Sequence, residues 1–245
     1  MKLNHNTILI TGGSSGIGLE LARTLLQKKN TVIVCGRSEE KLIAARQKLP
    51  SLIIHQCDIS REPERRRLCT WISQNYPGCN ILINNAAIVN KTDFRSDEHM
   101  IEKTYAEIET NLIAPISLTK LFLPVLEKNK DAAIINITTG LVFAPRTIYP
   151  IYNATKAGLH SFTKVLREQL KNTPVKVIEV MMPAIDTPWH NSNPPKIAIP
   201  VELAVADMLR YLELDKQEIK IGKVKLLSII SRIAPGFAFK KINSL

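Results

Sequence analysis

Short runs of apolar residues recur along the chain, and longer segments of amphipathic pattern separate them. The runs most typical of strands cover residues 7–11, 31–35, 52–57, 80–84, 132–138 and 175–181. Each run contains few polar residues, as expected for parallel strands that are covered on both faces. The pattern therefore predicts a parallel sheet with a buried strand at each of these positions.

The segments between the apolar runs have the period of amphipathic helices. Ile17, Leu21 and Leu25 recur every four residues, and Ser38 precedes two glutamates as an N-cap would. Later helices are expected at about 61–75, 96–128, 152–171 and 200–213. Alternating strands and helices predict an α/β fold, a Rossmann-type doubly wound parallel sheet with helices on both faces. Because no linker or internal repeat is apparent, residues 1–245 are expected to form a single domain.

A glycine-rich turn, TGGSSGIGLE, joins the first predicted strand to the first predicted helix. Glycine allows the backbone to turn tightly and to approach a pyrophosphate, and the helix N-terminus offers free N–H groups and a positive dipole end. The turn is therefore predicted to bind a dinucleotide. An ordinary glycine-rich turn is the alternative.

Several ordered motifs together resemble the short-chain dehydrogenase/reductase family. These motifs are the G-x-x-x-G-x-G turn, NNAA at 84–87, Asn111 and the Tyr152-x-x-x-Lys156 pair. The resemblance extends from residue 5 to about residue 200. More narrowly, residues 1–22 and the segment CGRSEEKL resemble the DltE-like group of bacterial oxidoreductases.

The resemblance implies a binding site for a nicotinamide dinucleotide. The residues that match the family's cofactor positions are Gly12, Ser14, Gly16, Ile17, Gly18, Arg37, Asp58, Asn84, Tyr152, Lys156, Ile185 and Thr187. In the family, the residue at Asp58 contacts the adenine amino group, and those at Ile185 and Thr187 bond the nicotinamide carboxamide. The family usually carries glycine where this chain has Ala87, so the detail of the site near Asn84 is expected to differ.

The end of the second predicted strand bears on the choice between NAD(H) and NADP(H). Gly36 stands where NAD-specific members of the family carry an acid, and Arg37 follows it. A 2′-phosphate requires a cation and is repelled by a carboxylate. NADP(H) is therefore the expected cofactor, with Ser14 as an extra phosphate donor. The alternative is that Arg37 is an ordinary surface arginine.

Tyr152 and Lys156 are four residues apart on a predicted helix whose other face is apolar, so both can point the same way. An ammonium roughly 5 Å from the phenol favours the phenolate by about 3 kcal/mol, or roughly two pKa units. We therefore expect Lys156 to lower the pKa of Tyr152 towards the range useful for general acid–base catalysis. Tyr149 has Asn153 at the same spacing, so Tyr152 is the predicted catalytic tyrosine.

The resemblance assigns further catalytic roles. Lys156 would also bind the nicotinamide ribose, and Asn111 would hold a water that connects the lysine to solvent. Thr139 occupies the place of the family's serine, which hydrogen-bonds the substrate oxygen, and threonine keeps that hydroxyl. The alternatives are that Asn111 makes a structural hydrogen bond and that Thr139 only packs. Thr138 should point away from the site, because neighbours in a strand alternate faces.

Charge is concentrated in a basic amphipathic C-terminal tail at about 223–245. The net charge is +11, and residues 216–245 hold seven Lys or Arg against the single acid Glu218. A solvated face is one explanation of such a segment, and an anionic membrane surface is another. Zinc-finger spacing and aromatic–basic repeats are absent from the sequence, so nucleic acid is not an expected partner.

The remaining composition suggests location and partners. The four cysteines show no CxxC spacing, so reduced cysteines and no metal site are expected. No apolar stretch reaches the ~20 residues of a membrane span, and no signal peptide fits before the first strand. A cytoplasmic location is therefore expected. A homodimer is expected through the helices around 96–128 and 152–171.

Together these features predict an oxidoreductase that transfers a hydride between NADP(H) and a small-molecule carbonyl or secondary alcohol. The alternative is a non-catalytic NADP(H)-binding sensor or regulatory protein. In that case Thr139, which replaces the family's serine, and Ala184, which replaces its glycine after the sixth predicted strand, record lost chemistry. In the tail, Leu226, Ile229, Ile230 and Ile233 recur at helical spacing, and Pro235-Gly236 is expected to end that helix. We expect protein to cover this apolar stripe, and an anionic membrane is the alternative cover.

Overall fold

The structure, a computed structural model, describes residues 1–190 and 194–244. Within these residues, seven strands form one parallel sheet in the order β3-β2-β1-β4-β5-β6-β9. The strands are β1 (Thr7–Thr11), β2 (Thr31–Gly36), β3 (Ile53–Gln56), β4 (Cys79–Asn84), β5 (Ala132–Thr139), β6 (Val175–Met182) and β9 (Glu218–Lys220). The order of the first six is that of a doubly wound dinucleotide-binding sheet. The predicted fold class is confirmed.

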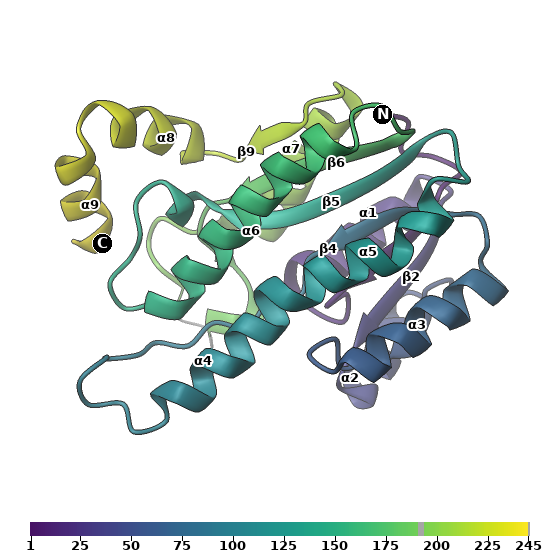
Figure 1. Cartoon of the computed structure of the whole chain (residues 1–245), viewed down its shortest axis with the longest axis horizontal. Coiled ribbons are helices and arrows are strands. Elements are labelled where there is room, and N and C mark those ends of the chain that lie inside the picture. The colour runs from purple at the N-terminus through teal and green to yellow at the C-terminus, as the bar shows by residue number, and fades with distance from the viewer. Residues whose placement is uncertain (191–193, 245) are drawn as a thin grey trace.

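Helices cover both faces of the sheet (Figure 1). One face carries α1 (Gly16–Gln27), α2 (Glu39–Lys48) and α7 (Val201–Glu213). The other carries α3 (Glu62–Asn75), α5 (Ala114–Leu126) and α6 (Pro150–Gln169). Ser38 caps α2 as expected, because its side chain accepts a hydrogen bond from the Lys41 N–H at 3.3 Å.

The central strand β5 shows why the strands could be located from the sequence. All of its residues are buried, and its side chains alternate between the two apolar cores. Ile135 packs in the core beneath α1 and α7, whereas Ile134 packs in the core beneath α3, α5 and α6. Because both faces are covered, the strand appears in the sequence as a continuous apolar run.

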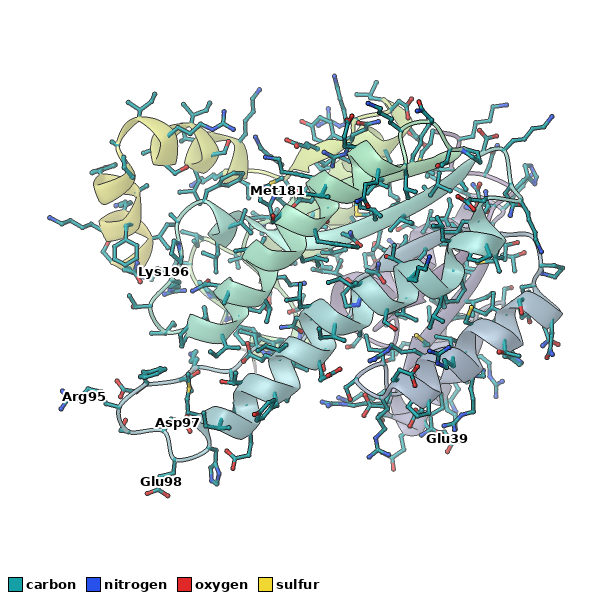
Figure 2. All side chains as sticks on the ribbon, in the orientation of Figure 1. Glu39, Arg95, Asp97, Glu98, Met181 and Lys196 are labelled. Carbon is teal, nitrogen blue, oxygen red and sulfur yellow. The ribbon has the colours of Figure 1, made fainter. Side chains whose placement is uncertain are left out.

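The helix predicted at 96–128 is interrupted. It consists of α4 (Met100–Ile108), a π-helical turn η1 (Glu109–Ile113) and α5. The loop before α4, on which Arg95, Asp97 and Glu98 are labelled, extends away from the sheet (Figure 2). A π turn adds one residue to the helical repeat and is frequent at functional sites. Here it contains Asn111, whose side chain points into the protein and is fully buried.

Three short strands were not predicted from the sequence. β7 (Ile185–Asp186) and β8 (Ile199–Pro200) pair with each other, and β9 extends the main sheet beyond β6. The 3-10 turn η3 (Pro188–His190) follows β7 along the chain, and the pairing of β7 with β8 brings Ile185 next to Ile199. Strands of two or three residues are too short for a periodic pattern to reveal them.

The C-terminal tail forms two helices, α8 (Val224–Ile233) and α9 (Pro235–Asn243), which lie at one side of the molecule (Figure 1). The helical spacing predicted for α8 is confirmed. α8 ends at Ile233, just before Pro235-Gly236, as expected, and Pro235 then begins the second helix, because proline suits the first turn of a helix. Large apolar side chains exposed on the tail are Leu226, Ile229, Ile233, Phe237 and Phe239. The tail's own domain therefore leaves most of the apolar stripe uncovered.

The tail is attached to the segment that joins β5 to α6. The Asn243 side chain accepts a hydrogen bond from the Thr147 N–H at 2.7 Å and donates one to the Pro145 carbonyl at 3.1 Å. Val224 is buried, and a Cβ atom placed on Gly140 would lie 2.9 Å from its Cγ2. Among the helices in the described ranges, none is long and apolar enough to cross a membrane.

Candidate active site

The carboxyl ends of the parallel strands bring the predicted site residues to one edge of the sheet. The glycine turn follows β1, Arg37 follows β2, Asp58 follows β3, Thr139 ends β5, and Thr187 follows β6. In doubly wound sheets, ligands bind at this edge where the strand order reverses. In this sheet the reversal lies between β1 and β4.

The glycine turn leaves the first turn of α1 open to a ligand. Gly12 and Gly16 have φ angles of +66° and +52°, which side chains other than glycine rarely adopt. A Cβ on Gly18 would lie 2.4 Å from the Gly12 carbonyl oxygen, so the turn packs too closely for alanine there. The side chain of Ser15 makes no capping hydrogen bond to α1 within the described part of the chain. The exposed N–H groups and the cradle of glycines fit a pyrophosphate.

Asn85 fastens the glycine turn to the segment after β4. Its side-chain amide donates to the Thr11 carbonyl at 2.9 Å and to the Gly12 carbonyl at 3.2 Å. In return, the Thr11 hydroxyl oxygen accepts from the Asn85 and Ala86 N–H groups at 3.1 and 3.0 Å. The NNAA motif is visible in the sequence, but the contact of its second asparagine with the glycine turn was not predicted.

Ser14 and Arg37 lie at the end of the predicted cofactor site that is expected to hold a 2′-phosphate. A Cβ on Gly36 would lie 3.5 Å from the Ser14 hydroxyl oxygen, so the Ser14 side chain reaches the end of β2. The side chain of Arg37 is exposed and forms no ion pair among the residues that the structure describes. A hydroxyl and an unpaired guanidinium are suitable donors to a phosphate. Nearby, Asp58 is half-buried, and its Oδ1 accepts hydrogen bonds from the N–H and hydroxyl of Ser60.

Polar residues form a row across the sheet beneath α6, and all but the exposed Glu218 are buried. Asn84 on β4 is in register with Asn136 on β5, Asn136 with Glu179 on β6, and Glu179 with Glu218 on β9. Asn84 Nδ2 donates to Asn136 Oδ1 at 2.8 Å, and Asn136 Nδ2 donates to the hydroxyl of Thr163 on α6 at 2.9 Å. Asn84 thus links the strand next to the cofactor cradle to the helix that carries Tyr152.

The Asn111 side chain makes structural hydrogen bonds. Its Oδ1 accepts from the Ile88 N–H at 2.9 Å, and its Nδ2 donates to the Ile88 carbonyl at 2.7 Å. A longer bond of 3.3 Å runs from Nδ2 to the Thr155 hydroxyl on α6. These contacts support the structural alternative for the side chain. The expected water near Lys156 stays a prediction.

Thr139, Tyr152 and Lys156 come together at the carboxyl end of β5. The Thr139 side chain lies close enough to the Tyr152 phenol to favour its ionised form, and the Thr139 hydroxyl oxygen accepts a hydrogen bond from the Leu141 N–H at 3.3 Å. Lys156 Nζ lies 5.9 Å from the centre of the Tyr152 ring and donates to the Ile137 carbonyl at 2.8 Å. Thr138 points away, as predicted, and its hydroxyl donates to Glu179 Oε1 at 2.5 Å. The structure therefore brings the tyrosine, the lysine and the threonine together at one place.

The electrostatics of this group differ from the expectation. Burial raises the pKa of Tyr152 to about 12; the hydrogen bond with Thr139 opposes the rise, and the Glu107 carboxylate adds to it. Burial also lowers the pKa of Lys156 to about 8, although the charge of Glu179 opposes the fall. The expected lowering of the Tyr152 pKa by Lys156 is therefore not seen. Removing each group from water disfavours its charged form, and this burial is the largest cause of both pKa shifts.

Glu107 is a buried acid that the sequence analysis missed. It lies on α4 one turn before Asn111, and it is almost completely buried. Its Oε1 accepts hydrogen bonds from the main-chain and side-chain nitrogens of Asn90, both at 2.8 Å, and burial raises its pKa. Its spacing of four residues before Asn111 was the available signal, because it places both side chains on one face of the helix.

The segment after β6 closes the site on the side of the glycine turn. Ile185 is buried in β7, and a Cβ on Gly16 would lie 3.4 Å from Thr187 Cγ2. Thr187 therefore lies next to the N-terminus of α1, and its contact with the nicotinamide stays a prediction. Trp189 packs edge-on against Tyr149, with ring centres 6.1 Å apart.

The doubly wound sheet and the open glycine turn define a Rossmann-type nucleotide-binding protein. Residues 6–198 match the family described as short chain dehydrogenase. The chain is also 43% identical over 249 residues to the uncharacterized oxidoreductase DltE of Bacillus subtilis (strain 168), a match that covers 100% of this chain and 99% of that protein. The chain therefore belongs to the short-chain dehydrogenase/reductase family of oxidoreductases, and the predicted DltE-like resemblance is confirmed.

Solved structures share the fold at lower identity. A short chain dehydrogenase from Burkholderia cenocepacia J2315 in complex with NADP has a TM-score of 0.87 and 24% identity, with 99% of both chains covered. A short chain dehydrogenase/reductase from Burkholderia phymatum in complex with NAD has a TM-score of 0.84 and 16% identity, covering 99% of this chain and 97% of that one. One of these two structures therefore holds NADP and the other holds NAD.

Proposed function

We propose that the protein is an NADP(H)-dependent oxidoreductase that interconverts a carbonyl compound and a secondary alcohol. The convergence of Thr139, Tyr152 and Lys156 at the same edge of the sheet as the glycine turn is the observation that carries this proposal. The nicotinamide ring, when bound, supplies or accepts the hydride. A small or medium-sized apolar ketone, aldehyde or secondary alcohol is the proposed substrate class.

Side chains of this protein would carry out the proton transfer to the substrate oxygen. The raised pKa of Tyr152 keeps its phenol protonated at neutral pH, which is the form that donates a proton to the oxygen of a carbonyl being reduced. The Thr139 hydroxyl would donate a hydrogen bond to the same oxygen as negative charge develops on it. The Lys156 ammonium would stabilise the phenolate that Tyr152 leaves behind. The predicted links from Lys156 to the ribose and from Asn111 to a water belong to the same proposal.

A panel of ketones and aldehydes, followed by the loss of NADPH absorbance, tests the proposed function. We expect purified protein to consume NADPH with at least one apolar carbonyl compound and to form the matching alcohol. NADPH binding without turnover of any member would instead support the non-catalytic sensor. Absence of NADPH binding would contradict both functions.

Cofactor preference is tested at Arg37. We expect NADPH to bind at least tenfold more tightly than NADH, a difference of about 1.4 kcal/mol, because the unpaired guanidinium and the Ser14 hydroxyl lie where the 2′-phosphate is proposed. Arg37→Ala should remove most of this preference in nucleotide titrations. Arg46→Ala, which removes an exposed arginine from α2, is the matched control and should keep it. Equal affinities in the unaltered protein would refute the assignment.

We further propose a cytoplasmic homodimer whose subunits meet through α4, α5 and α6. Exposed apolar side chains on these helices, including Ile101, Tyr105 and Val165, offer a surface for such a contact. A partner subunit is also the proposed cover for the apolar stripe of the tail, since its own domain leaves that stripe exposed.

Deleting residues 226–245 tests the role of the tail. We expect the truncated protein to lose solubility or to change its mass in light scattering, because a protein contact has been removed. Leu214→Ser, which removes an exposed leucine outside the tail, should have neither effect. Unchanged mass and solubility after truncation, together with sedimentation of the full chain on anionic liposomes at low salt, would favour the membrane instead.

A further inference from the structure

A buried carboxylate, Glu179, lies on β6 beneath the candidate active site and takes no part in the proposed proton transfer. Its side chain is 0% exposed. Thr138 donates a hydrogen bond to Oε1 at 2.5 Å, and Nδ1 of His160 lies 3.0 Å from Oε1 and 2.9 Å from Oε2. A buried carboxylate is costly unless hydrogen bonds and an opposite charge compensate for the lost water. The hydrogen bonds to the Glu179 carboxylate are present, and the neighbouring cations are found on α6.

Helix α6 presents Lys156 and His160 to the same side, because they lie one turn apart. Lys156 Nζ donates to the carbonyl of Ile137, which directly precedes Thr138 on β5. The lysine is therefore held next to the residue whose hydroxyl binds Glu179. The charge of Glu179 raises the pKa of Lys156 against the lowering effect of burial.

Charged groups on the other elements around Glu179 have partners of their own. Glu218, its register neighbour on β9, lies 3.3 Å from Nη1 of Arg167. Lys220, also on β9, lies over the ring of Phe143 at 5.3 Å, and that ring packs edge-on against His160. Thr138 is the residue of β5 that faces the carboxylate. Lys156 and His160 are therefore the groups on α6 with which the Glu179 charge is associated.

We propose that Glu179 is a positioning residue for the reaction: it is the counter-charge that keeps Lys156 in its ammonium form, while Thr138 and His160 hold its carboxylate in place. This inference rests on the proposed function, because Lys156 acts there on Tyr152. A neutral Lys156 could not stabilise the phenolate that forms when Tyr152 gives up its proton. Glu179 would thus support catalysis without touching the substrate.

Titration of the lysine side chains by NMR tests this inference without any turnover. Protein labelled with ¹³C at lysine Cε is titrated with pH, and the signal that Lys156→Met removes is assigned to Lys156. With Glu179→Gln, the negative charge is lost and the ammonium is less favoured, so the pKa of Lys156 should fall by about one pH unit or more. For the same reason, the decline of kcat/KM for carbonyl reduction at high pH should move to lower pH by a similar amount.

Two further variants make the result specific. Glu218→Gln makes the same charge change on the next strand, where the side chain is 42% exposed and paired with Arg167, and it should leave the Lys156 titration unchanged. Thr138→Val withdraws one donor from the carboxylate and should lower the Lys156 pKa by less than Glu179→Gln does. If Glu179→Gln does not fold, the Lys156 titration is measured in Thr138→Val alone. An unchanged Lys156 pKa in that variant would then overturn the inference.

An unchanged Lys156 titration in the folded variant would overturn the inference, even if activity fell. An equal effect of Glu218→Gln would overturn it as well, because the response would then be general to the surrounding charge. Failure of the proposed function is recognised separately: the panel of carbonyl compounds would show no turnover by the unaltered protein, while the NMR titration would still report on Glu179 and Lys156.

Discussion

Tyr152→Phe is expected to lower kcat for carbonyl reduction by about 10²–10⁴-fold, the range that a positioned general acid contributes. The substitution removes the phenolic hydroxyl and keeps the ring, so the packing of α6 and the binding of NADPH should change little. The loss should therefore appear in kcat, measured by NADPH absorbance, and not in the dissociation constant of NADPH measured by fluorescence titration.

Tyr149→Phe is the matched control for Tyr152→Phe. The two rings are 6.4 Å apart, and burial raises the pKa of both phenols. Tyr149 does not share the position of Tyr152 one turn before Lys156, and we expect its substitution to leave kcat near the unaltered value. A large loss in Tyr149→Phe with little loss in Tyr152→Phe would reverse the assignment of the catalytic tyrosine.

Thr139→Ala should lower kcat by about a hundredfold, which is the usual cost of removing one donor to a developing oxyanion. Thr139→Ser keeps the hydroxyl and should retain or increase turnover, because it removes only the methyl group that narrows the pocket. Both variants are compared in the same steady-state assay. Equal turnover by Thr139→Ala and the unaltered protein would show that Thr139 only packs.

The strands β1 to β6 and most helices could be predicted because their environment is uniform along their length. Parallel strands covered on both faces are continuous apolar runs, and each predicted strand lies within one residue of the observed bounds. The π turn at Glu109–Ile113 could not be predicted, because one added residue hardly changes a helical pattern. The second tail helix was missed because Pro235 is compatible with either the end or the beginning of a helix.

The composition of the candidate site was more predictable than its electrostatics. The glycine turn and the Tyr152–Lys156 spacing are local features, so the sequence contains them in full. The pKa of Tyr152 depends on burial and on Glu107, which comes from another helix. The association of Glu179 with Lys156 could not be predicted either, because it depends on how the strand β6 and the helix α6 pack against each other.

The polar row of Asn84, Asn136, Glu179 and Glu218 has a consequence for how the chain folds. Apolar parallel strands can slide past one another and still bury apolar surface, so their alignment is weakly specified by hydrophobicity alone. A slip of one residue between β4 and β5 would separate Asn84 from Asn136 and leave a buried amide unpaired, at a cost of about 1–3 kcal/mol. The same slip between β5 and β6 would move the Glu179 carboxylate away from Thr138 and remove their hydrogen bond. These polar pairs therefore favour the correct strand register, and sheets in a shifted register are destabilised before the active site can form on them.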